Sequence, residues 1–239
     1  DRPASLRNQF VSFSQPIPKP HDEPVWLHLF ADTRFRLFVN GRFIAYGPAR
    51  FVTRYPEYDS YRLDDYLRNG DNDVRVEVNY YGCSSFQSMP DGKPGFVAAG
   101  TGQSYDFVTP CRLQACVHRA CDATSPHFSF AQNPIEICDT RVLERELRAC
   151  AHETPVPCKD VPWLELRPRS VPYPAYRFVR PRRLVAAGPL RADLTLAGFQ
   201  SLNTDYKDCQ PNNRLSRSFA TWIWSPRRQD TDLYCFWSD

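Results

Sequence analysis

The residues from 32 to 82 constrain the fold more than any other part of this chain, and they begin with a β-hairpin. Residues 34–39 (RFRLFV) carry large apolar side chains at every second position, a period-two pattern that predicts a half-buried strand. Asn40 and Gly41 follow, and both tolerate the positive φ of a two-residue type I′ turn. Residues 42–46 (RFIAY) predict the returning strand.

Counting outward from this turn gives the predicted register of the hairpin. The cross-strand pairs are Val39 with Arg42, Leu37 with Ile44 and Phe35 with Tyr46 on one face, and Phe38 with Phe43 on the other. Both faces then carry large apolar side chains. We therefore expect the hairpin to lie within a two-layer structure and not on an open sheet.

The same stretch turns twice more. Asp64 is placed to cap a short helical turn at residues 65–68, which Asn69 and Gly70 would end in the left-handed conformation. Residues 74–78 (VRVEV) again alternate strictly, which predicts another half-buried strand.

Six short motifs occur in order along this stretch. They are ADT at 31–33, FVNG at 38–41, GPAR at 47–50, YDSY at 58–61, LRNGDN at 67–72 and VNYYG at 78–82. Together they resemble the N-terminal β-sandwich of bacterial α-L-rhamnosidase-like glycoside hydrolases, which is related to the galactose-binding-type jelly rolls of many glycosidases. The alternative is an unrelated sandwich with the same turn chemistry, although the rules of strand connection leave few such topologies.

The composition agrees with an all-β, loop-rich chain. Of the 239 residues, 42% are hydrophobic and 14% aromatic, which excludes disorder, and 22 prolines against 10 glycines favour irregular connections over long helices. We predict an antiparallel β-sandwich, a galactose-binding-like jelly roll, with Pro-rich connections and at most short helices. Residues 1–190 would hold the sandwich with its opening segment and Pro-rich connector, and residues 191–239 would begin a further, incomplete region.

Local patterns predict several further elements. Residues 10–13 predict an edge strand that an extended Pro-rich connection follows, and residues 25–31 (VWLHLFA) predict a central strand buried on both faces. Residues 96–99 and 104–108 predict short strands. Residues 139–150 predict a helix with an apolar stripe and one i,i+4 ion pair.

The resemblance also implies where the chemistry of this family lies. In these enzymes a carboxylic acid and a second carboxylate, about 6.5–9.5 Å apart, hydrolyse the rhamnoside with inversion. Both lie on an (α/α)6 barrel that follows the N-terminal sandwiches, and no helical run here supplies one. The catalytic domain would therefore be a missing C-terminal part of the same parent chain. Residues 207–214 (KDCQPNNR) lack the acidic residue of the family's catalytic phrase, whereas residues 136–141 (EICDTR) match a phrase that indicates a structural ion network. We assign no catalytic residue and no cofactor.

The charge pattern gives no sign of a polyanionic partner. A net charge of +3 is close to balance, and the arginines of residues 177–183 are interrupted by apolar residues, which indicates a solvated loop or a domain interface and no nucleic-acid groove. No apolar run approaches the ~20 residues of a membrane span. The chain opens on Asp1, so either a signal peptide has been removed or the sequence is an excised fragment.

Nine cysteines are present, an odd number without the spacing of zinc knuckles. Cys111, Cys116 and Cys121 form the one cluster, and His118 or His127 could complete a metal site with them. On one helical stripe they would instead be small buried apolar groups, which is the interpretation we favour, and a disulfide among them stays open. We assign no metal site, and the pattern favours a reducing, cytoplasmic compartment.

The candidate carbohydrate-contacting residues are aromatic or planar polar side chains next to predicted turns. They are Tyr80, Tyr81, Arg50, Tyr55 and Tyr58, with the loop at 84–93 beside them. Sugar sites combine apolar walls with a few polar groups, and loops at one end of a sandwich carry such sites. The alternative is that these tyrosines pack at the rim of the sandwich or against the missing domain. Residues 71–73 (DND) offer oxygen ligands for calcium, but they read first as an ordinary turn.

Three functions compete. The first is a non-catalytic N-terminal β-sandwich module of a rhamnosidase-like glycoside hydrolase, which acts as a scaffold and a candidate carbohydrate-contacting surface. The second is an autonomous carbohydrate-binding module, and the third is a self-sufficient enzyme of another class. No Gly-rich phosphate loop, nucleophile elbow or His-Glu-x-x-His motif supports the third. A long parent with a helix-rich C-terminal part would favour the first over the other two.

Overall fold

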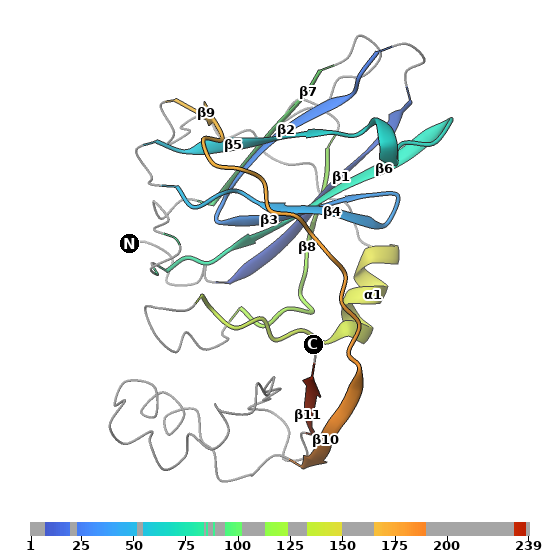
Figure 1. Ribbon diagram of the computed structural model, residues 1–239, viewed down its shortest axis with the longest axis vertical. Helices are drawn as coiled ribbons and strands as arrows, with labels where there is room; N and C mark the ends of the chain where they lie inside the picture. The colour runs from blue at the N-terminus through green and yellow to red at the C-terminus, as the bar shows by residue number, and fades with distance from the viewer. Residues whose placement is uncertain are drawn as a thin grey trace.

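A computed structural model describes most of the first half of the chain and several later segments (Figure 1). The described residues are 8–19, 23–51, 55–83, 85, 88, 94–101, 113–123, 133–149, 165–189 and 232–237. They contain eleven strands and a single α-helix. Two sheets face each other, so the predicted all-β sandwich is confirmed.

The larger sheet has five strands in the order β4-β3-β6-β1-β8. Their bounds are Arg42–Gly47 for β4, Arg34–Val39 for β3, Asp71–Tyr80 for β6, Gln9–Pro18 for β1 and Gln114–Val117 for β8. Every neighbouring pair is antiparallel. In β3 and β6 every second residue is buried, as their alternation predicts.

The second sheet has four strands in the order β7-β2-β5-β9. Their bounds are Gly95–Thr101 for β7, Trp26–Asp32 for β2, Glu57–Arg62 for β5 and Arg167–Pro168 for β9, and only the β5–β9 pair is parallel. β2 is central, as predicted. It is buried on both faces only toward its end, however, because Trp26 remains 37% exposed.

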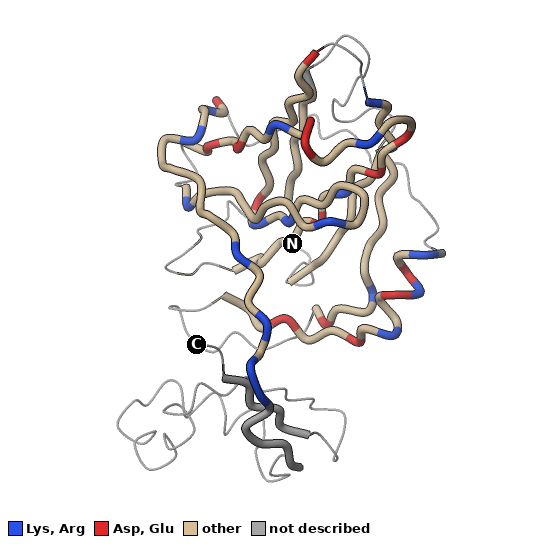
Figure 2. Tube along the Cα trace, turned by 45° about the vertical axis from the view of Figure 1, so that its right-hand side comes forward, with Lys and Arg blue, Asp and Glu red and all other residues tan. Residues whose placement is uncertain are grey.

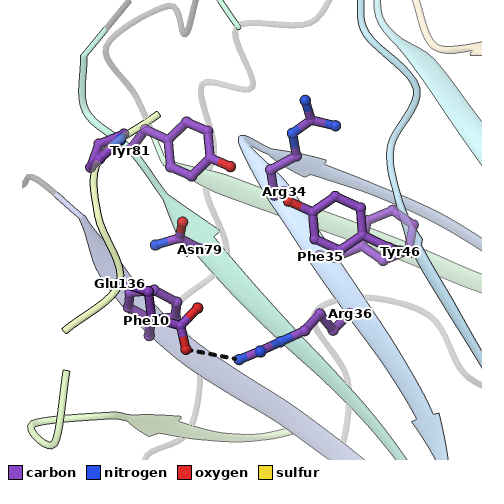
Figure 3. A pocket seen from close by; sticks show the side chains of 9 residues that line it. Phe10, Arg34, Phe35, Arg36, Tyr46, Asn79, Tyr81 and Glu136 are labelled. Atoms are coloured by element: carbon purple, nitrogen blue, oxygen red, sulfur yellow. Dashed lines mark ion pairs between the residues drawn. The ribbon is translucent and has the colours of Figure 1, made fainter. Parts of the chain in front are cut away.

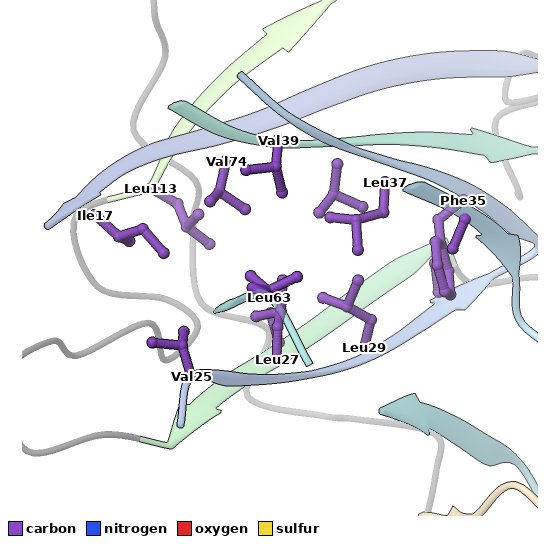
Figure 4. Close-up of a cluster of buried hydrophobic side chains, with 14 of the residues drawn as sticks. Ile17, Val25, Leu27, Leu29, Phe35, Leu37, Val39, Leu63, Val74 and Leu113 are labelled. Carbon is purple, nitrogen blue, oxygen red and sulfur yellow. The ribbon is translucent and has the colours of Figure 1, made fainter. Parts of the chain in front are cut away.

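The hydrophobic core lies between these two sheets. Figure 4 shows side chains of β1, β3 and β6 meeting those of β2 across the gap between the layers. Leu29 of β2 and Leu37 of β3 are both fully buried. An aliphatic side chain of this size contributes about 1.5–3 kcal/mol when it leaves water. The period-two pattern thus fixes which face of each strand joins the core.

The Asn40-Gly41 hairpin forms with positive φ at both turn residues, 51° and 75°, but part of its predicted register is wrong. The observed pairs are Val39 with Arg42, Phe38 with Phe43, Leu37 with Ala45, Arg36 with Tyr46 and Phe35 with Gly47. Ile44 is therefore the extra residue of a β-bulge. The bulge sets Gly47 beside the buried Phe35, where even a Cβ atom would lie 2.5 Å from the ring carbon Cζ. A tyrosine would not fit opposite Phe35.

The turn supports a direct test by replacement of Gly41. A Cβ atom at Gly41 meets nothing within 4 Å, so Gly41→Val would act only through its φ of +75°. A β-branched residue is strained there, and we expect unfolding free energy to fall by about 1–3 kcal/mol in urea denaturation. Gly41→Asn is the matched control, because Asn adopts this conformation more readily. Equal stability of the valine variant and the native chain would contradict the turn assignment.

The opening strand β1 is not the edge strand that the sequence predicts. It pairs with β6 over its whole length and with β8 from Val11 to Ser14. Pro16 and Pro18 belong to the strand and lie beyond its pairing with β8. The backbone of Phe10, which has the same parity, accepts a hydrogen bond from the β8 side. The proline nitrogens therefore point away from β6, toward the side on which this part of β1 has no paired strand and needs no N–H donor.

The turn before β6 is organised by one buried amide, that of Asn72. Its Oδ1 accepts hydrogen bonds from the Asn40 side chain and the Arg68 backbone, both at 2.8 Å. Its Nδ2 donates to the carbonyl oxygens of Arg68 and Gly70 at 2.9 Å and of Ile17 at 3.4 Å. Asn72 is fully buried. One side chain therefore joins the hairpin turn, the loop before β6 and the end of β1.

The short helical turn is a 3-10 helix at Asp64–Tyr66 with Leu63 at its N-cap, so the predicted Asp64 cap is wrong. The Asp64 carboxylate accepts a hydrogen bond from the Val25 backbone at 3.3 Å and one from Arg62 at 2.9 Å instead. Asp64 thus connects this turn to the start of β2.

Residues 169–178, which we call the strap, run across the outside of both sheets (Figure 1). Arg169 forms an ion pair with Asp59 of β5 at 3.0 Å, and Tyr173 accepts a hydrogen bond from the Ser60 backbone at 2.7 Å. On the other sheet, the Tyr176 hydroxyl accepts from the Tyr46 backbone N–H at 3.0 Å and donates to its carbonyl at 2.6 Å. The strap therefore ties β5 to β4.

Helix α1, Thr140–Ala149, confirms the helix predicted at 139–150. Asp139 begins it, with its carboxylate accepting from the Arg141 backbone at 3.0 Å. The Glu146 carboxylate accepts hydrogen bonds from the Arg119 and Ala120 backbones at 3.0 and 3.2 Å, which hold the helix against the turn after β8. Among the described residues no helix is long and apolar enough to cross a membrane. The predicted strand at 104–108 lies outside the described residues.

Candidate functional site

A small open hollow lies at one end of the larger sheet and has a volume of about 100 Å³ (Figure 3). Its walls combine aromatic rings with planar polar groups: Phe10, Arg34, Phe35, Arg36, Tyr46, Asn79, Tyr81, Pro134 and Glu136. Strands β1, β3, β4 and β6 and the segment before α1 contribute to it. Ligand pockets that enclose a small molecule usually measure about 300–1,000 Å³, so this hollow can offer only part of a binding surface.

Tyr81 forms the back of the hollow. Its backbone N–H donates to Thr33 Oγ1 at 3.2 Å, and its hydroxyl is hydrogen-bonded to Tyr46 and Arg34. Only 4% of Tyr81 is exposed, and burial is the main reason why its pKa lies far above the usual value. The phenol is therefore a neutral hydrogen-bonding group at all ordinary pH values.

Arg34 and Tyr46 form the next part of the wall. The Arg34 guanidinium lies over the Tyr46 ring at 5.5 Å and donates to the Pro48 carbonyl oxygen at 3.2 Å. Its Nε is buried and has no hydrogen-bond partner in the part of the chain that the structure describes. Tyr46 is 39% exposed, so its ring is the accessible aromatic surface here.

Arg36 forms ion pairs with two carboxylates at the hollow. Its guanidinium pairs with Glu77 at 3.0 Å and with Glu136 at 3.8 Å, and Figure 3 shows the latter pair spanning the opening. Glu77 also pairs with Arg75 at 3.4 Å. Both carboxylates therefore face cations, and the guanidinium of Arg34 adds a positive charge to the hollow that neither carboxylate pairs with.

This arrangement does not provide hydrolytic chemistry. An inverting glycosidase needs a protonated acid and a separate carboxylate that activates water. Among the described residues, Glu136 is the one carboxylate that lines the hollow, and it faces Arg36. Aromatic faces with nearby amide, guanidinium and phenol groups are instead the chemistry of weak sugar contact.

The structure separates the residues that the sequence grouped as a carbohydrate site. Tyr81 lines the hollow, whereas Tyr80 is equally buried but lies at a core-facing position of β6 and does not line it. Tyr58 belongs to β5 and packs edge-on against His28 at 5.6 Å. Tyr55 is 45% exposed and lies beneath the Arg167 guanidinium, and Arg50 is exposed. Sugar contact by these residues stays a prediction, and only Tyr81 joins the hollow.

No metal centre emerges among the described residues, where no group of three potential ligands gathers. His118 lies next to Ser12, with 2.5 Å between Nε2 and Oγ, and Glu146 is 3.7 Å from Nδ1. Burial lowers the pKa of this histidine. Cys116 is disulfide-bonded, but Cys121 is free and Cys111 lies outside the described residues, so a disulfide within the cluster stays a prediction. The calcium alternative at residues 71–73 loses its central ligand, because both polar atoms of Asn72 are already hydrogen-bonded.

The other residues that line the hollow were not predicted from the sequence, although the alternation along β3 and β6 could have placed some of them on one face of the sheet. Arg34 pairs with Asn79 and Arg36 with Glu77 across β3 and β6. These four side chains share the outer face of the sheet, because the intervening residues join the core. Glu136 had no parity signal: the sequence predicted it only as part of a structural ion network, and it reaches the hollow from far along the chain.

The comparisons with solved structures agree with the motif resemblance. The chain is similar to the GH78 family rhamnosidase of Bacillus sp. GL1, with 26% sequence identity and a TM-score of 0.66, over 78% of this chain and 21% of that one. The α-L-rhamnosidase from Dictyoglumus thermophilum matches 74% of this chain and 21% of its own, with 12% identity and a TM-score of 0.49. The α-L-rhamnosidase from Aspergillus terreus matches 64% and 19%, with 12% identity and a TM-score of 0.46.

The chain thus spans about a fifth of the length of these enzymes. No protein-family model and no curated protein matches the sequence. The likeness to a region of a GH78 rhamnosidase, predicted from the six motifs, is confirmed by the Bacillus structure.

Proposed function

We propose that this chain is the non-catalytic N-terminal β-sandwich module of a larger α-L-rhamnosidase-like glycoside hydrolase, in which it acts as a scaffold. The observation that carries the proposal is the Bacillus comparison: 78% of this chain matches only 21% of a rhamnosidase. A missing catalytic part, which we take to be a C-terminal (α/α)6 domain of the same parent, would then make up much of the remainder.

The strap supports a scaffolding role. It leaves the sandwich toward β10 (Arg183–Pro189), and its path is fixed by contacts to both sheets. Figure 2 shows acidic and basic residues mixed over the strands, whereas the segment that leads out of the strap carries basic residues (blue) and no acidic ones (red). Arg177, Arg180, Arg182 and Arg183 are all exposed there. Because the chain leaves the sandwich in a fixed direction and exposes several cations there, this segment could position a neighbouring domain of the same chain and contact it.

The division at about residue 190 remains our proposal for the domain boundary. β10 pairs antiparallel with β11, Asp232–Trp237, so this two-stranded sheet joins the end of the connector to the further region across the proposed boundary. A galactose-binding-like jelly roll likewise remains our proposal for the finer class of the sandwich.

Activity measurements test the scaffold proposal. We expect the purified chain to release no product from an aryl α-L-rhamnoside, because inverting hydrolysis needs a pair of carboxylates that the hollow does not supply. The complete parent polypeptide, assayed beside it at equal molarity, is the positive control. A rate from the chain alone that survives repurification and disappears on Glu136→Gln would show that the chain is itself an enzyme.

A second candidate function, contact with carbohydrate, is favoured by the composition of the hollow. An exposed ring at Tyr46 and polar groups at Arg34, Asn79 and Tyr81 could hold one sugar ring from one side. Because most of each hydrogen bond is offset by lost water contacts, we expect only millimolar affinity, on the order of 4 kcal/mol.

Titration followed by NMR separates the two candidates. We expect saturable shifts with L-rhamnose in the native chain and their loss in Tyr46→Ala, whose side chain is accessible enough to be removed without opening the core. Phe178→Ala is the control, since Phe178 is also an exposed aromatic residue but lies outside the hollow and is not among the candidate carbohydrate-contacting residues. If the native chain does not respond to rhamnose or galactose at tens of millimolar, carbohydrate contact is excluded and the scaffold role stands alone.

A further inference from the structure

Two free cysteines face each other beside the hollow. Cys121 follows the turn after β8, Cys138 immediately precedes the Asp139 that begins α1, and the two are joined by an isolated antiparallel bridge. Both are free and partly buried. The thiol of Cys121 donates a hydrogen bond to the sulfur of Cys138.

The backbone hydrogen bonds define which kind of bridge this is. The Asp122 N–H donates to the Ile137 carbonyl at 2.8 Å, and the Asp139 N–H donates to the Ala120 carbonyl at 3.0 Å. These bonds flank the two cysteines, so the cysteines form a non-hydrogen-bonded pair, in which Cα atoms lie about 4.5 Å apart. A disulfide requires Cα atoms about 4.4–6.8 Å apart. The backbone therefore already holds both residues at bonding distance.

We propose that Cys121 and Cys138 form a reversible thiol–disulfide pair that a small disulfide of the glutathione type oxidises. The Cys138 thiolate attacks one sulfur of glutathione disulfide and releases one glutathione thiolate, which leaves a mixed disulfide on Cys138. The Cys121 thiolate then attacks the Cys138 sulfur and releases the second glutathione. Two cysteine thiols are oxidised, one disulfide is reduced, and the two thiol protons pass to the glutathione thiolates.

The bond would act on the wall of the hollow. Glu136, two residues before Cys138, pairs with Arg36 at 3.8 Å across the opening. The neighbouring Ile135 carbonyl accepts from Asn8 Nδ2 at 2.9 Å. These two contacts place the segment before α1 against the larger sheet, and a disulfide would anchor that segment covalently to the turn after β8. Oxidation thus holds the Glu136 side of the hollow in place, whatever the hollow binds.

The surroundings of the two thiols set the rate of this exchange. Burial raises the pKa of Cys121 and of Cys138, so little thiolate is present at neutral pH. The hydrogen bond from Cys121 lowers the pKa of Cys138 against that trend, which makes Cys138 the first nucleophile. Since exchange proceeds through thiolate, its rate should rise about tenfold per pH unit below these pKa values.

The sequence offers a direct readout of the bond. Trypsin cuts after Arg119 and Arg141, and the peptide between them, residues 120–141, contains only these two cysteines. We would incubate the folded chain with mixtures of reduced and oxidised glutathione at pH 7 and pH 8, alkylate free thiols, and digest. The expected result is a peptide that lacks both alkyl groups and two hydrogens, that returns to the dialkylated form with excess reduced glutathione, and that forms faster at pH 8.

Two controls keep the result specific. Cys83, which is likewise a partly buried thiol outside any disulfide, should stay alkylated or carry a single glutathione under the same conditions. In Cys121→Ser the reaction should stop at the mixed disulfide on Cys138. A peptide 120–141 that keeps both alkyl groups at every glutathione ratio, while the melting temperature shows that the chain is folded, would overturn the proposal. So would a disulfide that joins either cysteine to Cys83.

Discussion

Replacing Arg169 by methionine is expected to lower the free energy of unfolding by about 3–5 kcal/mol, the usual cost of leaving one partner of a buried ion pair alone. Asp59 is fully buried, and the Arg169 side chain is 8% exposed. The guanidinium donates to both carboxylate oxygens of Asp59, and also to the Val171 and Pro172 carbonyls at 3.0 and 3.2 Å. Methionine fills a similar volume but supplies none of these donors, and only Tyr61 and a backbone group would still bind Asp59.

The pH dependence gives this prediction a signature. Burial is the largest influence on Asp59 and raises its pKa, while Arg169 lowers it, so the pKa should rise further in Arg169→Met. When the pKa of a carboxyl group is higher in the folded than in the unfolded chain, the group stabilises the fold most at pH values below its unfolded pKa, near 3.8. That stabilisation is lost as the pH rises through the folded pKa. The variant should therefore be weakest at neutral pH and recover part of its deficit near pH 4.

Arg148→Met is the matched control for this ion pair. Arg148 pairs with Glu144 at 2.6 Å on the surface of α1, where both side chains are exposed. Such pairs contribute about 0.3–0.5 kcal/mol. Urea denaturation at neutral and acid pH would compare the two variants, and equal losses would mean that the Asp59–Arg169 pair is not buried in solution.

Asn72→Asp is expected to cost about 2–4 kcal/mol, even though it changes one atom of the side chain. The amide now donates to the Arg68 and Gly70 carbonyls at 2.9 Å and to the Ile17 carbonyl at 3.4 Å. A carboxylate would face these oxygens without a proton to share, and each buried group left unpaired costs about 1–3 kcal/mol. Protonation at low pH restores only one donor.

Asn69→Asp makes the same change in the same loop at an exposed position. We expect it to leave stability within about 0.5 kcal/mol of the native chain. Chemical denaturation of the two variants in parallel isolates the effect of burial. A loss of similar size in both would attribute the cost to local charge and not to the buried network.

The contrast between Asn72 and its neighbours shows what the sequence could predict about the fold. The alternation of apolar and polar residues is visible within a few consecutive positions, so the buried faces of β3 and β6 can be predicted from it alone. The loop around Asn72 looked like an ordinary turn, because its partners at Asn40 and Ile17 are distant in sequence. The bulge at Ile44 was hidden for the same reason: it depends on the space around Phe35 and not on the turn.

The candidate site divides in the same way. Tyr81 was predicted because it is an aromatic residue next to a predicted turn, and it does line the hollow. Arg34 and Asn79 could be placed beside each other only with the β3–β6 register in hand. Glu136 depends on the packing of the segment before α1, on which local periodicity carries no information.

The strap has a practical consequence for where this chain can be cut. β4 lies at the edge of the larger described sheet, and the Tyr176 hydroxyl occupies both the N–H and the carbonyl of Tyr46 on it. Tyr173 does the same for the N–H of Ser60 on β5. A recombinant fragment that stopped before residue 169 would leave these groups open, and open strand edges recruit strands of other molecules. Fragments meant to stay monomeric should therefore extend past Phe178, so that Tyr173 and Tyr176 still cover these backbone groups.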